Sequence, residues 1–437
     1  MIKPVEITQL GAPQFRSPFA DDAHESLGLA RFKSDADCVP LHLTHYAGLS
    51  PAVQTHFQVA GPRERIFFNP ATTRAGIVTC GGLCPGLNNV IRSIFLELYY
   101  HYKVSEVLGF QYGYQGLNPV SGYPPMKLEL GSVSDIHESG GTVLGTSRGP
   151  QDTRVMVDYL KQLGVSILFP VGGDGTQRGA LAIHKEAQRQ GYPLAVVGVP
   201  KTIDNDIQYV SRTFGFDTAV EQARSVIDCA HNEARAVFNG IGLVKLMGRD
   251  SGFIAASAAL ASGEVNYVLI PEIPFDLEGP RGLLTVLEQR LSQNRHAVIV
   301  VAEGAGQHLI QRDSLSTDAS GNILHADIGI FLRDRFRQHF AARQTPVNVR
   351  YIDPSYIIRG LMANTQDAVL CDRLARHAVH AAMAGKSGLI IGLLNDRFIH
   401  VPVHMAVEGR KQVQPSSSLW NAVLSSTGQP LSFVNTD

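Results

Sequence analysis

The sequence has few cysteines and almost no tryptophan, with five and one respectively in 437 residues. The cysteines are odd in number and scattered, and no second pair or histidine cluster completes a zinc site beside Cys80 and Cys84. We therefore expect reduced thiols rather than a disulfide framework. No apolar run approaches the length of a membrane span, and the first thirty residues lack the apolar core of a signal peptide. These absences predict a cytoplasmic protein without a membrane partner.

The chain also lacks an excess of charge of either sign. Its 38 lysines and arginines and 39 aspartates and glutamates give a net charge of −1, which argues against a nucleic acid partner. Glycine, in contrast, is abundant, and the 42 glycines gather in short loops rather than in low-complexity tracts. This distribution favours a ligand-binding α/β protein, and the length is sufficient for two or three domains.

Strand-like and helix-like stretches alternate along the chain after residue 73. Apolar β-type runs at 75–80, 167–171 and 195–199 are separated by longer helical stretches, of which one is expected from about Asn89 to Tyr102. This alternation predicts an α/β protein with doubly wound domains and mainly parallel sheets. Residues 1–73 are rich in proline and histidine and weakly periodic, so we interpret them as an appended N-terminal extension.

Two short polar loops follow directly on two of these apolar strands. Residues 172–176 read Gly-Gly-Asp-Gly-Thr, and residues 200–206 read Pro-Lys-Thr-Ile-Asp-Asn-Asp. Because a helical stretch separates the two strands, both loops should emerge at the carboxyl edge of one parallel sheet, where such sheets bind ligands. The first loop offers backbone amides and a carboxylate, which suit polyphosphate and Mg²⁺. The second offers a lysine, a hydroxyl and two carboxylates, which suit proton removal, so the pair indicates phosphoryl transfer.

Several of these residues also have simpler interpretations. Asp174 is a candidate metal ligand, but a carboxylate at this position also caps helices. Arg148 could neutralise charge on transferring phosphates, although a lone arginine is more often a solvated surface group. Residues 81–86 form a glycine-rich strand-to-helix turn, which brings backbone amides close to a phosphate or simply makes a tight turn.

Taken together, the motifs resemble those of phosphofructokinases. The resemblance runs from about Arg74 to beyond Arg373, and the N-terminal extension and the loop before Pro150 look most like the long-chain subgroup of plants and trypanosomatids. It implies a homotetramer or homodimer with two Rossmann-like domains, active in glycolysis and open to allosteric control. It also implies a nucleotide-binding domain over 74–215 and 358–408, and a sugar-phosphate domain over 216–357 and 409–437.

The resemblance further implies roles for individual residues, with fructose 6-phosphate and ATP as substrates and Mg²⁺ bound through Asp174. Asp204 would be the base that takes the proton from the 1-hydroxyl of the sugar. The other expected catalytic residues are Arg148, Lys201, Thr202 and Arg249. The expected nucleotide-binding residues are Gly81, Tyr114, Arg148, Gly173, Asp174, Gly175 and Thr176. The expected sugar-phosphate residues are Thr202, Asp204, Asp206, Met247, Gly248, Arg249, Glu303, Arg350, Tyr356 and Arg359.

The sequence departs from the short bacterial pattern at three places. Phe238 and Asn239 stand where those enzymes carry an arginine, and Tyr356 stands where they carry a histidine. The contact that reaches the 6-phosphate across subunits is therefore expected to be reduced or remodelled. Lys201 replaces a glycine. A surface ion pair is the alternative interpretation of Arg350 and Arg359.

The phosphoryl donor depends on Gly175. Pyrophosphate-using relatives carry a second aspartate there, whose charge would repel an α-phosphate, whereas Gly175 leaves that space open. Lys201 occurs with either donor, so ATP is the prediction and a pyrophosphate-dependent phosphotransferase is the alternative. NAD kinases and diacylglycerol kinases share the Gly-Gly-Asp-Gly loop but not the run at 200–206. A non-catalytic regulatory subunit would have lost Asp174 or Asp204, and both are present.

Overall fold

The structure is a computed structural model that describes residues 3–20, 32–44, 54–311, 317 and 324–435. The chain folds into two compact units, each assembled from three separate segments. The first unit comprises Met1–Thr202, Ile207–Gly215 and Gly360–Arg410. The second comprises Ile203–Asp206, Phe216–Arg359 and Lys411–Asp437.

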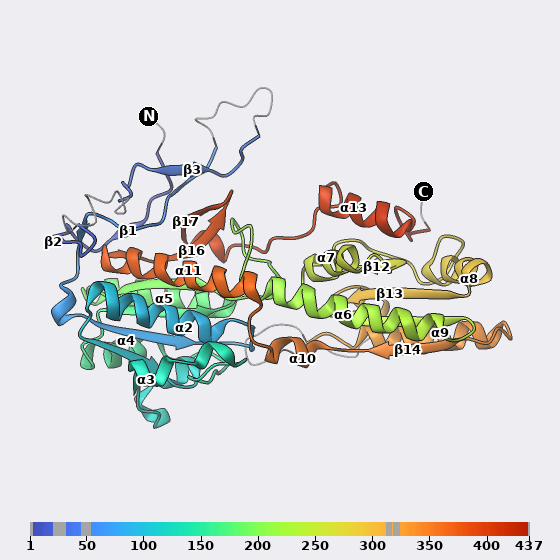
Figure 1. Cartoon of the computed structure of the whole chain (residues 1–437), viewed down its shortest axis with the longest axis horizontal. Helices are drawn as coiled ribbons and strands as arrows, with labels where there is room; N and C mark the ends of the chain where they lie inside the picture. The colour runs from blue at the N-terminus through green and yellow to red at the C-terminus, as the bar shows by residue number, and fades with distance from the viewer. Residues whose placement is uncertain (1–2, 21–31, 45–53, 312–316, 318–323, 436–437) are drawn as a thin grey trace. The chain divides into compact units, whose positions relative to one another are not determined.

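A seven-stranded sheet forms the centre of the first unit (Figure 1). Its strand order is β17-β16-β10-β9-β6-β7-β8, and the strands from β16 to β7 run parallel. The two edge strands, β17 and β8, are antiparallel to their neighbours. The strands are β6 (Arg74–Thr79), β7 (Glu106–Phe110), β8 (Met126–Lys127), β9 (Ile167–Gly172), β10 (Ala195–Pro200), β16 (Leu389–Leu394) and β17 (Arg397–Pro402).

Both faces of this sheet are buried, which explains why its strands read as continuous apolar runs. Leu168 and Val196 pack into a core with residues of two helices, α4 and α5, while the alternate residues Phe169 and Val197 are fully buried on the opposite face. Helix α4 packs on α5, and α2 packs on α11. The helices are α2 (Leu87–Leu96), α3 (Leu130–Val133), α4 (Thr153–Gln162), α5 (Asp174–Arg189), α11 (Thr365–Met383) and α12 (Val403–Ala406).

The described part of the N-terminal extension packs onto the rest of the first unit. Strand β1 (Thr8–Gln9) pairs with β15 (Lys386–Ser387), and two further short pairs follow. These are β2 (Phe15–Arg16) with β5 (Arg65–Ile66), and β3 (Cys38–Pro40) with β4 (His56–Gln58). The Asp35 carboxylate accepts hydrogen bonds from Arg63 at 3.0 Å and from Lys386 at 2.9 Å. The extension is therefore held by both backbone pairing and charge.

The second unit contains a four-stranded, fully parallel sheet of order β12-β13-β11-β14. Helices α8 and α9 pack on one face in a shared apolar core, while α6 contacts β11, β13 and β14 and packs on α7. The strands are β11 (Gly240–Leu246), β12 (Tyr267–Leu269), β13 (His296–Ala302) and β14 (Asn348–Ile352). The helices are α6 (Phe216–Arg235), α7 (Phe253–Ser262), α8 (Leu283–Asn294), α9 (Ile328–Ala342), α10 (Ser355–Gly360) and α13 (Ser418–Thr427).

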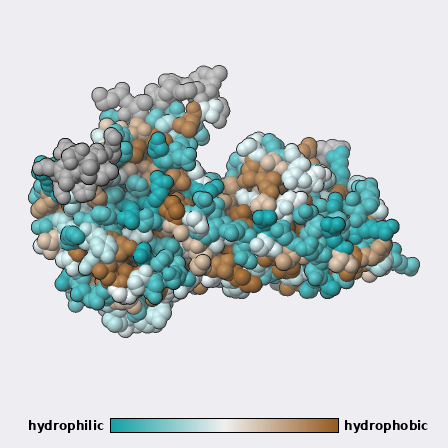
Figure 2. Space-filling model, viewed as in Figure 1, coloured by the Kyte–Doolittle hydropathy of each residue, from teal (hydrophilic) through white to brown (hydrophobic). Residues whose placement is uncertain are grey.

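The predicted α/β class with mainly parallel sheets is confirmed. In the first unit the carboxyl ends of β10, β9 and β6 are neighbours in the sheet, and in the second unit those of β13, β11 and β14 are neighbours. On the face drawn in Figure 2, hydrophilic residues predominate and hydrophobic residues form small groups. Among the described residues, no helix is both long enough and apolar enough to cross a membrane.

Candidate active site

In the first unit, the loop after β9 leads directly into helix α5. Gly173 is the N-cap residue and has no side chain, so no N-cap side chain accepts a hydrogen bond from the backbone N–H groups of the first turn. Asp174 is the first helical residue rather than the cap, which removes the simple capping interpretation. A Cβ atom added at Gly175 meets no atom within 4 Å, so the space beside this residue is open. Such a helix start suits an anion.

The Asp174 carboxylate lies beside two arginines of the same unit. Arg178 Nε donates to Asp174 Oδ2 at 3.1 Å, and Arg410 Nη2 lies 4.0 Å from the same oxygen. The side chain is 26% exposed and therefore open to a ligand. Among the described residues no group of three histidine, cysteine or acidic side chains gathers to hold a metal ion. A Mg²⁺ ion would thus take one carboxylate here and its other ligands from phosphate and water, as this ion commonly does.

Lys201 connects the loops that follow β6, β9 and β10. Its backbone N–H donates to Gly172 O at 3.0 Å, and its ammonium donates to Gly82 O at 2.5 Å. Gly81 has a φ of +86°, and a Cβ at this position would lie 3.5 Å from Lys201 Nζ. The backbone conformation at position 81 therefore favours glycine, and Lys201 contacts the loop that follows β6 and the end of β9.

A buried glutamine that the sequence patterns did not single out ties two of these strand ends together. Gln177 Nε2 donates to Gly172 O at 3.0 Å and to Val199 O at 3.4 Å, so one side chain spans the ends of β9 and β10. The side chain is fully buried, and a Cβ at Gly198 would lie 2.1 Å from its Oε1. Gln177 thereby fixes the spacing between the loop of Asp174 and the loop of Lys201.

The structure gives Tyr114 and Arg148 different surroundings. The Tyr114 hydroxyl donates to Thr176 O at 2.6 Å, and burial raises the pKa of this phenol well above its usual range. This hydroxyl therefore supports the first turn of α5. Arg148 is exposed, and its loop is joined to Gly81, because Thr146 Oγ1 donates to Gly81 O at 2.6 Å.

In the second unit, Asp204 sits in a cluster of charged side chains. Removal from water raises the pKa of its carboxyl to about 8, and the negative charges of Asp206 and Glu303 act in the same direction. The Arg359 guanidinium and a backbone hydrogen bond from Arg249 oppose this increase in the pKa. The backbone carbonyl of Asp204 accepts a hydrogen bond from the Ser251 hydroxyl at 3.1 Å.

The ends of β11 and β13 are joined by backbone hydrogen bonds. Glu303 N donates to Leu246 O at 2.9 Å, and Gly304 N donates to Gly248 O at 3.1 Å. Gly248 has a φ of +133°, and a Cβ added at Gly304 would lie 1.8 Å from Arg249 O, so side chains are excluded from this contact. Met247, Arg249 and Glu303 are consequently brought to one place.

Not all of the predicted sugar-phosphate residues join this cluster. Arg359 on α10 influences Asp204, as described above, whereas Tyr356 on the same helix is 87% exposed. Arg350 Nε lies 3.8 Å from Glu233 Oε2, and both side chains are more than half exposed. Within this single chain, Arg350 therefore takes part in the surface ion pair that was the alternative interpretation.

A second polar cluster that the sequence did not reveal holds the turn between β14 and α10. Lys245 Nζ donates to Asp327 at 2.7 Å and to Asp353 at 2.8 Å, and the Tyr351 hydroxyl donates to Asp327 at 2.9 Å. Burial opposes the charge of Lys245, but the two carboxylates outweigh it and raise the pKa of the lysine. Ser355, the first residue of α10, also donates to Asp353. The helix that carries Arg359 is thus anchored to the strand that leads to Met247.

Comparison with known proteins gives consistent matches. Residues 74–382 match the pattern of the phosphofructokinase family. The chain is 50% identical over 382 residues to an ATP-dependent 6-phosphofructokinase of Borreliella burgdorferi, with 86% of each chain covered. It is 46% identical over 422 residues to ATP-dependent 6-phosphofructokinase 1 of Arabidopsis thaliana, covering 96% of this chain and 88% of that relative. A Trypanosoma brucei brucei relative named ATP-dependent 6-phosphofructokinase is 49% identical over 369 residues, with 84% and 75% covered.

Solved structures match the fold at lower sequence identity. A pyrophosphate-dependent phosphofructokinase from Marinobacter aquaeolei gives a TM-score of 0.67 at 20% identity, covering 84% of this chain and 94% of that chain. A phosphofructokinase of Pichia pastoris gives a TM-score of 0.62 at 20% identity, with 88% and 39% covered. At this level of identity the likeness supports the fold alone.

Proposed function

The chain belongs to the phosphofructokinase family, and from this premise we propose how its residues carry out phosphoryl transfer. It is an ATP-dependent 6-phosphofructokinase, which transfers the γ-phosphoryl group of ATP to the 1-hydroxyl of fructose 6-phosphate in glycolysis. The three relatives at 46–50% identity are all named as ATP-dependent enzymes. The prediction of ATP rather than pyrophosphate, made from Gly175, is therefore confirmed.

Asp204 is the general base of this proposal. Its raised pKa, among Asp206, Glu303 and Arg359, is the observation that carries the assignment. A carboxyl group whose pKa lies near the working pH accepts a proton more readily than an ordinary surface aspartate. Asp204 accordingly orients the 1-hydroxyl and accepts its proton as the oxygen attacks the γ-phosphorus.

The donor phosphates bind at the start of α5 in this proposal. The backbone N–H groups of Gly173, Gly175 and Thr176 donate hydrogen bonds to the phosphate oxygens. The positive φ of Gly81 lets the loop after β6 approach the same phosphates. Asp174 would hold Mg²⁺, which would supply positive charge to neutralise the donor phosphates. Arg178, which pairs with Asp174 in the structure, would share this carboxylate with the metal.

Positive side chains then stabilise the charge on the transferring phosphoryl group. Lys201, Arg148 and Arg249 supply this charge. Lys201 is positioned for this role by its two hydrogen bonds to the neighbouring loops. The Thr202 hydroxyl lies in the same loop, next to Lys201, and binds the acceptor.

Fructose 6-phosphate is held by residues of the second unit. Glu303 accepts hydrogen bonds from sugar hydroxyls, because a carboxylate has acceptors on both oxygens. Asp206, Met247 and Gly248 line the sugar, and Arg359 binds the 6-phosphate as a guanidinium fork. Arg350 and Tyr356 complete the phosphate site.

The exposure of Arg350 and Tyr356 also bears on assembly and location. Exposed residues with this proposed role fit a homotetramer or homodimer, in which a partner copy would cover them. A cytoplasmic location agrees with the five cysteines, all of which are free thiols.

The decisive experiment is the substitution Asp204→Asn, which keeps the shape of the side chain but removes the base. We expect kcat to fall by roughly 10²- to 10⁴-fold, with the KM for fructose 6-phosphate little changed. Asp250→Asn, next to Arg249 but without a proposed role, is the matched control. A kcat within a factor of a few of the unaltered enzyme would assign Asp204 a structural role instead.

A further inference from the structure

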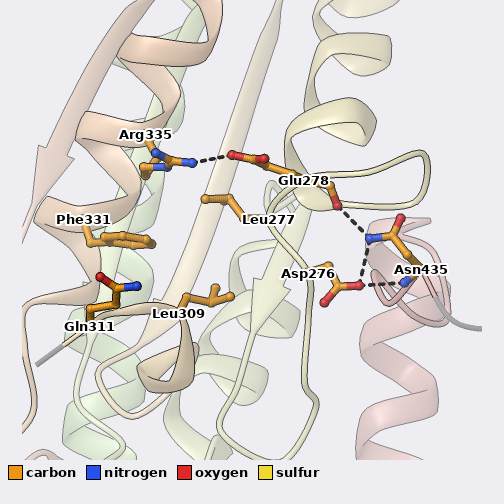
Figure 3. A pocket seen from close by; sticks show the side chains of 8 residues that line it. All are labelled: Asp276, Leu277, Glu278, Leu309, Gln311, Phe331, Arg335 and Asn435. Atoms are coloured by element: carbon orange, nitrogen blue, oxygen red, sulfur yellow. Dashed lines mark hydrogen bonds and ion pairs between the residues drawn. The ribbon is translucent and has the colours of Figure 1, made fainter.

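A pocket of about 560 Å³ opens in the second unit, and it shares no residue with the proposed site (Figure 3). Its volume is within the range of small-molecule sites. Its walls come from the loop after β12, from the segment after β13, from two successive turns of α9 and from the C-terminal segment. The lining residues are Asp276, Leu277, Glu278, Leu309, Gln311, Phe331, Arg335 and Asn435.

The polar wall of this pocket is held in place by Asn435. The backbone N–H and the Nδ2 group of Asn435 both donate to Asp276 Oδ2 at 2.8 Å, and Nδ2 also donates to Glu278 O at 2.7 Å. In return, Arg281 N donates to Asn435 Oδ1 at 3.0 Å. The loop that carries Asp276 is therefore pre-organised rather than shaped only by a ligand.

The floor of the pocket is apolar and continuous with the core. Leu277 is 6% exposed, and Leu309 and Phe331 pack against the same core cluster. In Figure 3 the Phe331 ring lies across the pocket from Asp276, with Leu277 and Leu309 between them. An apolar or aromatic ligand body thus finds a matching surface there.

The charges of the pocket leave one carboxylate available. Arg335 donates to Glu278, so these two side chains neutralise each other. Hydrogen bonds from the backbone and side chain of Asn435 lower the pKa of Asp276, which is therefore ionised at neutral pH. Both of these bonds end on Oδ2, and Oδ1 receives no hydrogen bond from the described residues.

We propose that this pocket binds a small organic ammonium ion with an aromatic or other apolar body. Asp276 Oδ1 accepts a charge-assisted hydrogen bond from the ammonium group, and Phe331, Leu277 and Leu309 cover the body. Among the described lining residues the one cation, Arg335, is paired with Glu278, so the charge of Asp276 disfavours a phosphate-bearing ligand such as either substrate of the enzyme. The site is separate from the catalytic one.

Tryptamine is a suitable probe. Indole-3-acetate is the control ligand, because it has the same indole ring but the opposite charge. Each is titrated into the full-length protein by calorimetry and by ligand-observed NMR. We expect saturable binding of tryptamine and at least roughly tenfold weaker binding of indole-3-acetate. Equal affinity for the two probes, or no tryptamine binding at millimolar concentration, overturns the proposal.

Three variants locate the binding. Asp276→Asn should weaken tryptamine binding about tenfold, and Phe331→Ala about two- to fivefold. Asp334→Asn lies on the same helix, outside the pocket, and is the matched control that should bind like the unaltered protein. Tryptamine binding that Asp276→Asn leaves unchanged contradicts the proposal.

A fourth variant leaves the hydrogen bonds of Asp276 intact. Gln311 is exposed at the rim, and Gln311→Lys places an ammonium group of the chain itself beside the pocket. This variant should weaken tryptamine binding while preserving the melting temperature and the phosphoryl-transfer activity. If it binds tryptamine as tightly as the unaltered protein, the ligand is held elsewhere.

Discussion

At the scale of single residues, Asp204 shows how a fold can make one carboxyl group basic at a cost to stability. Its surroundings favour the protonated form, since burial, Asp206 and Glu303 all raise its pKa. In the unfolded chain the same carboxyl would ionise near its ordinary pKa of 3.8. The native state therefore binds a proton that the unfolded state has already released over the pH range between these two values.

This difference gives a stability prediction with a definite sign. Because the pKa of Asp204 is higher in the folded state, its contribution to the free energy of unfolding decreases as the pH rises from about 4 to about 8. Asp204→Asn cannot ionise, so its melting temperature relative to the unaltered enzyme should increase steadily over this range. Differential scanning calorimetry at several pH values measures the trend. A constant difference between the two proteins would mean that Asp204 titrates normally.

Gly175 is the residue that we propose distinguishes the two phosphoryl donors. The space beside it is open, so an aspartate side chain fits without rearrangement, and any loss of activity then reflects charge and occupation of the donor site. We expect Gly175→Asp to reduce kcat/KM with ATP steeply, because the new carboxylate repels the α-phosphate. Activity with pyrophosphate, which has no α-phosphate to repel, should be retained or increased.

The measurement is kcat/KM for both donors at fixed Mg²⁺ and saturating fructose 6-phosphate. Gly131→Asp, on the exposed helix α3 with open space around it and no left-handed backbone conformation, controls for an added negative charge outside the loop. An undiminished ATP activity in Gly175→Asp would show that this residue does not face the nucleotide.

At the scale of secondary structure, the strand ends were predictable and the side chains that brace them were not. Apolar runs followed by short polar loops, the first of them glycine-rich, mark the ends of β9 and β10 directly in the sequence. Gln177 gives no such signal, because its structural role depends on a hydrogen bond to Val199, which lies 22 residues further along the chain. The role of Lys245 likewise depends on an ion pair with Asp327, which lies 82 residues away in the sequence. Contacts of this kind arise from the folded arrangement and have no local pattern.

The helix expected from about Asn89 to Tyr102 illustrates the same limit. Helix α2 ends at Leu96 and continues as a π-helix over Glu97–Tyr102. Hydrophobic spacing hardly distinguishes one π turn from an α turn. The buried Glu97 accepts a hydrogen bond from Arg376 on α11, so a distant partner accompanies the change of helix type.

Gln177 also provides a prediction at this scale. Gln177→Met keeps the size of the side chain but removes the N–H groups that hold Gly172 and Val199. Because the loops of Asp174 and Lys201 then lose their fixed spacing, we expect kcat to fall about 10- to 100-fold and the half-saturating Mg²⁺ concentration to rise. The KM for fructose 6-phosphate should change little.

Steady-state kinetics with Mg²⁺ as the varied component tests this. Gln188→Met, on the exposed side of the same helix, is the matched control. If the Gln177 variant is destabilised but keeps its kcat and its Mg²⁺ dependence, the glutamine serves packing alone.

At the scale of the whole molecule, the extension is more than an appendage to the first unit. Arg63 and Lys386 are 8% and 3% exposed, and both are balanced by the carboxylate of Asp35. Burial alone would raise the pKa of Asp35, but the two cations outweigh this effect and lower it. The resulting stabilisation is present above the ordinary pKa of an aspartate and is lost as the pH falls through the depressed value.

We therefore expect Asp35→Asn to destabilise the protein by about 1–3 kcal/mol at neutral pH, since two buried cations lose their partner. The partial exposure of Asp35 limits the loss. Thermal unfolding should show a smaller difference at acidic pH, where the unaltered carboxylate is itself protonated. Glu64→Gln, a nearby exposed site, should have no effect. An equal melting temperature for Asp35→Asn would mean that backbone pairing alone holds the extension.

The chain passes between the two units five times, after residues 202, 206, 215, 359 and 410. One of these crossings separates Thr202 from Asp204, two residues that the proposed mechanism places on the same acceptor. No single cut in the polypeptide can therefore release either unit whole, and neither unit can be exchanged as a cassette between related genes. Recombination, gene splitting or circular permutation with a break inside the loop at 200–206 would therefore separate Thr202 from Asp204. In the proposed mechanism, the unit that binds the sugar thus takes its base from a short loop that lies in the sequence between two segments of the other unit.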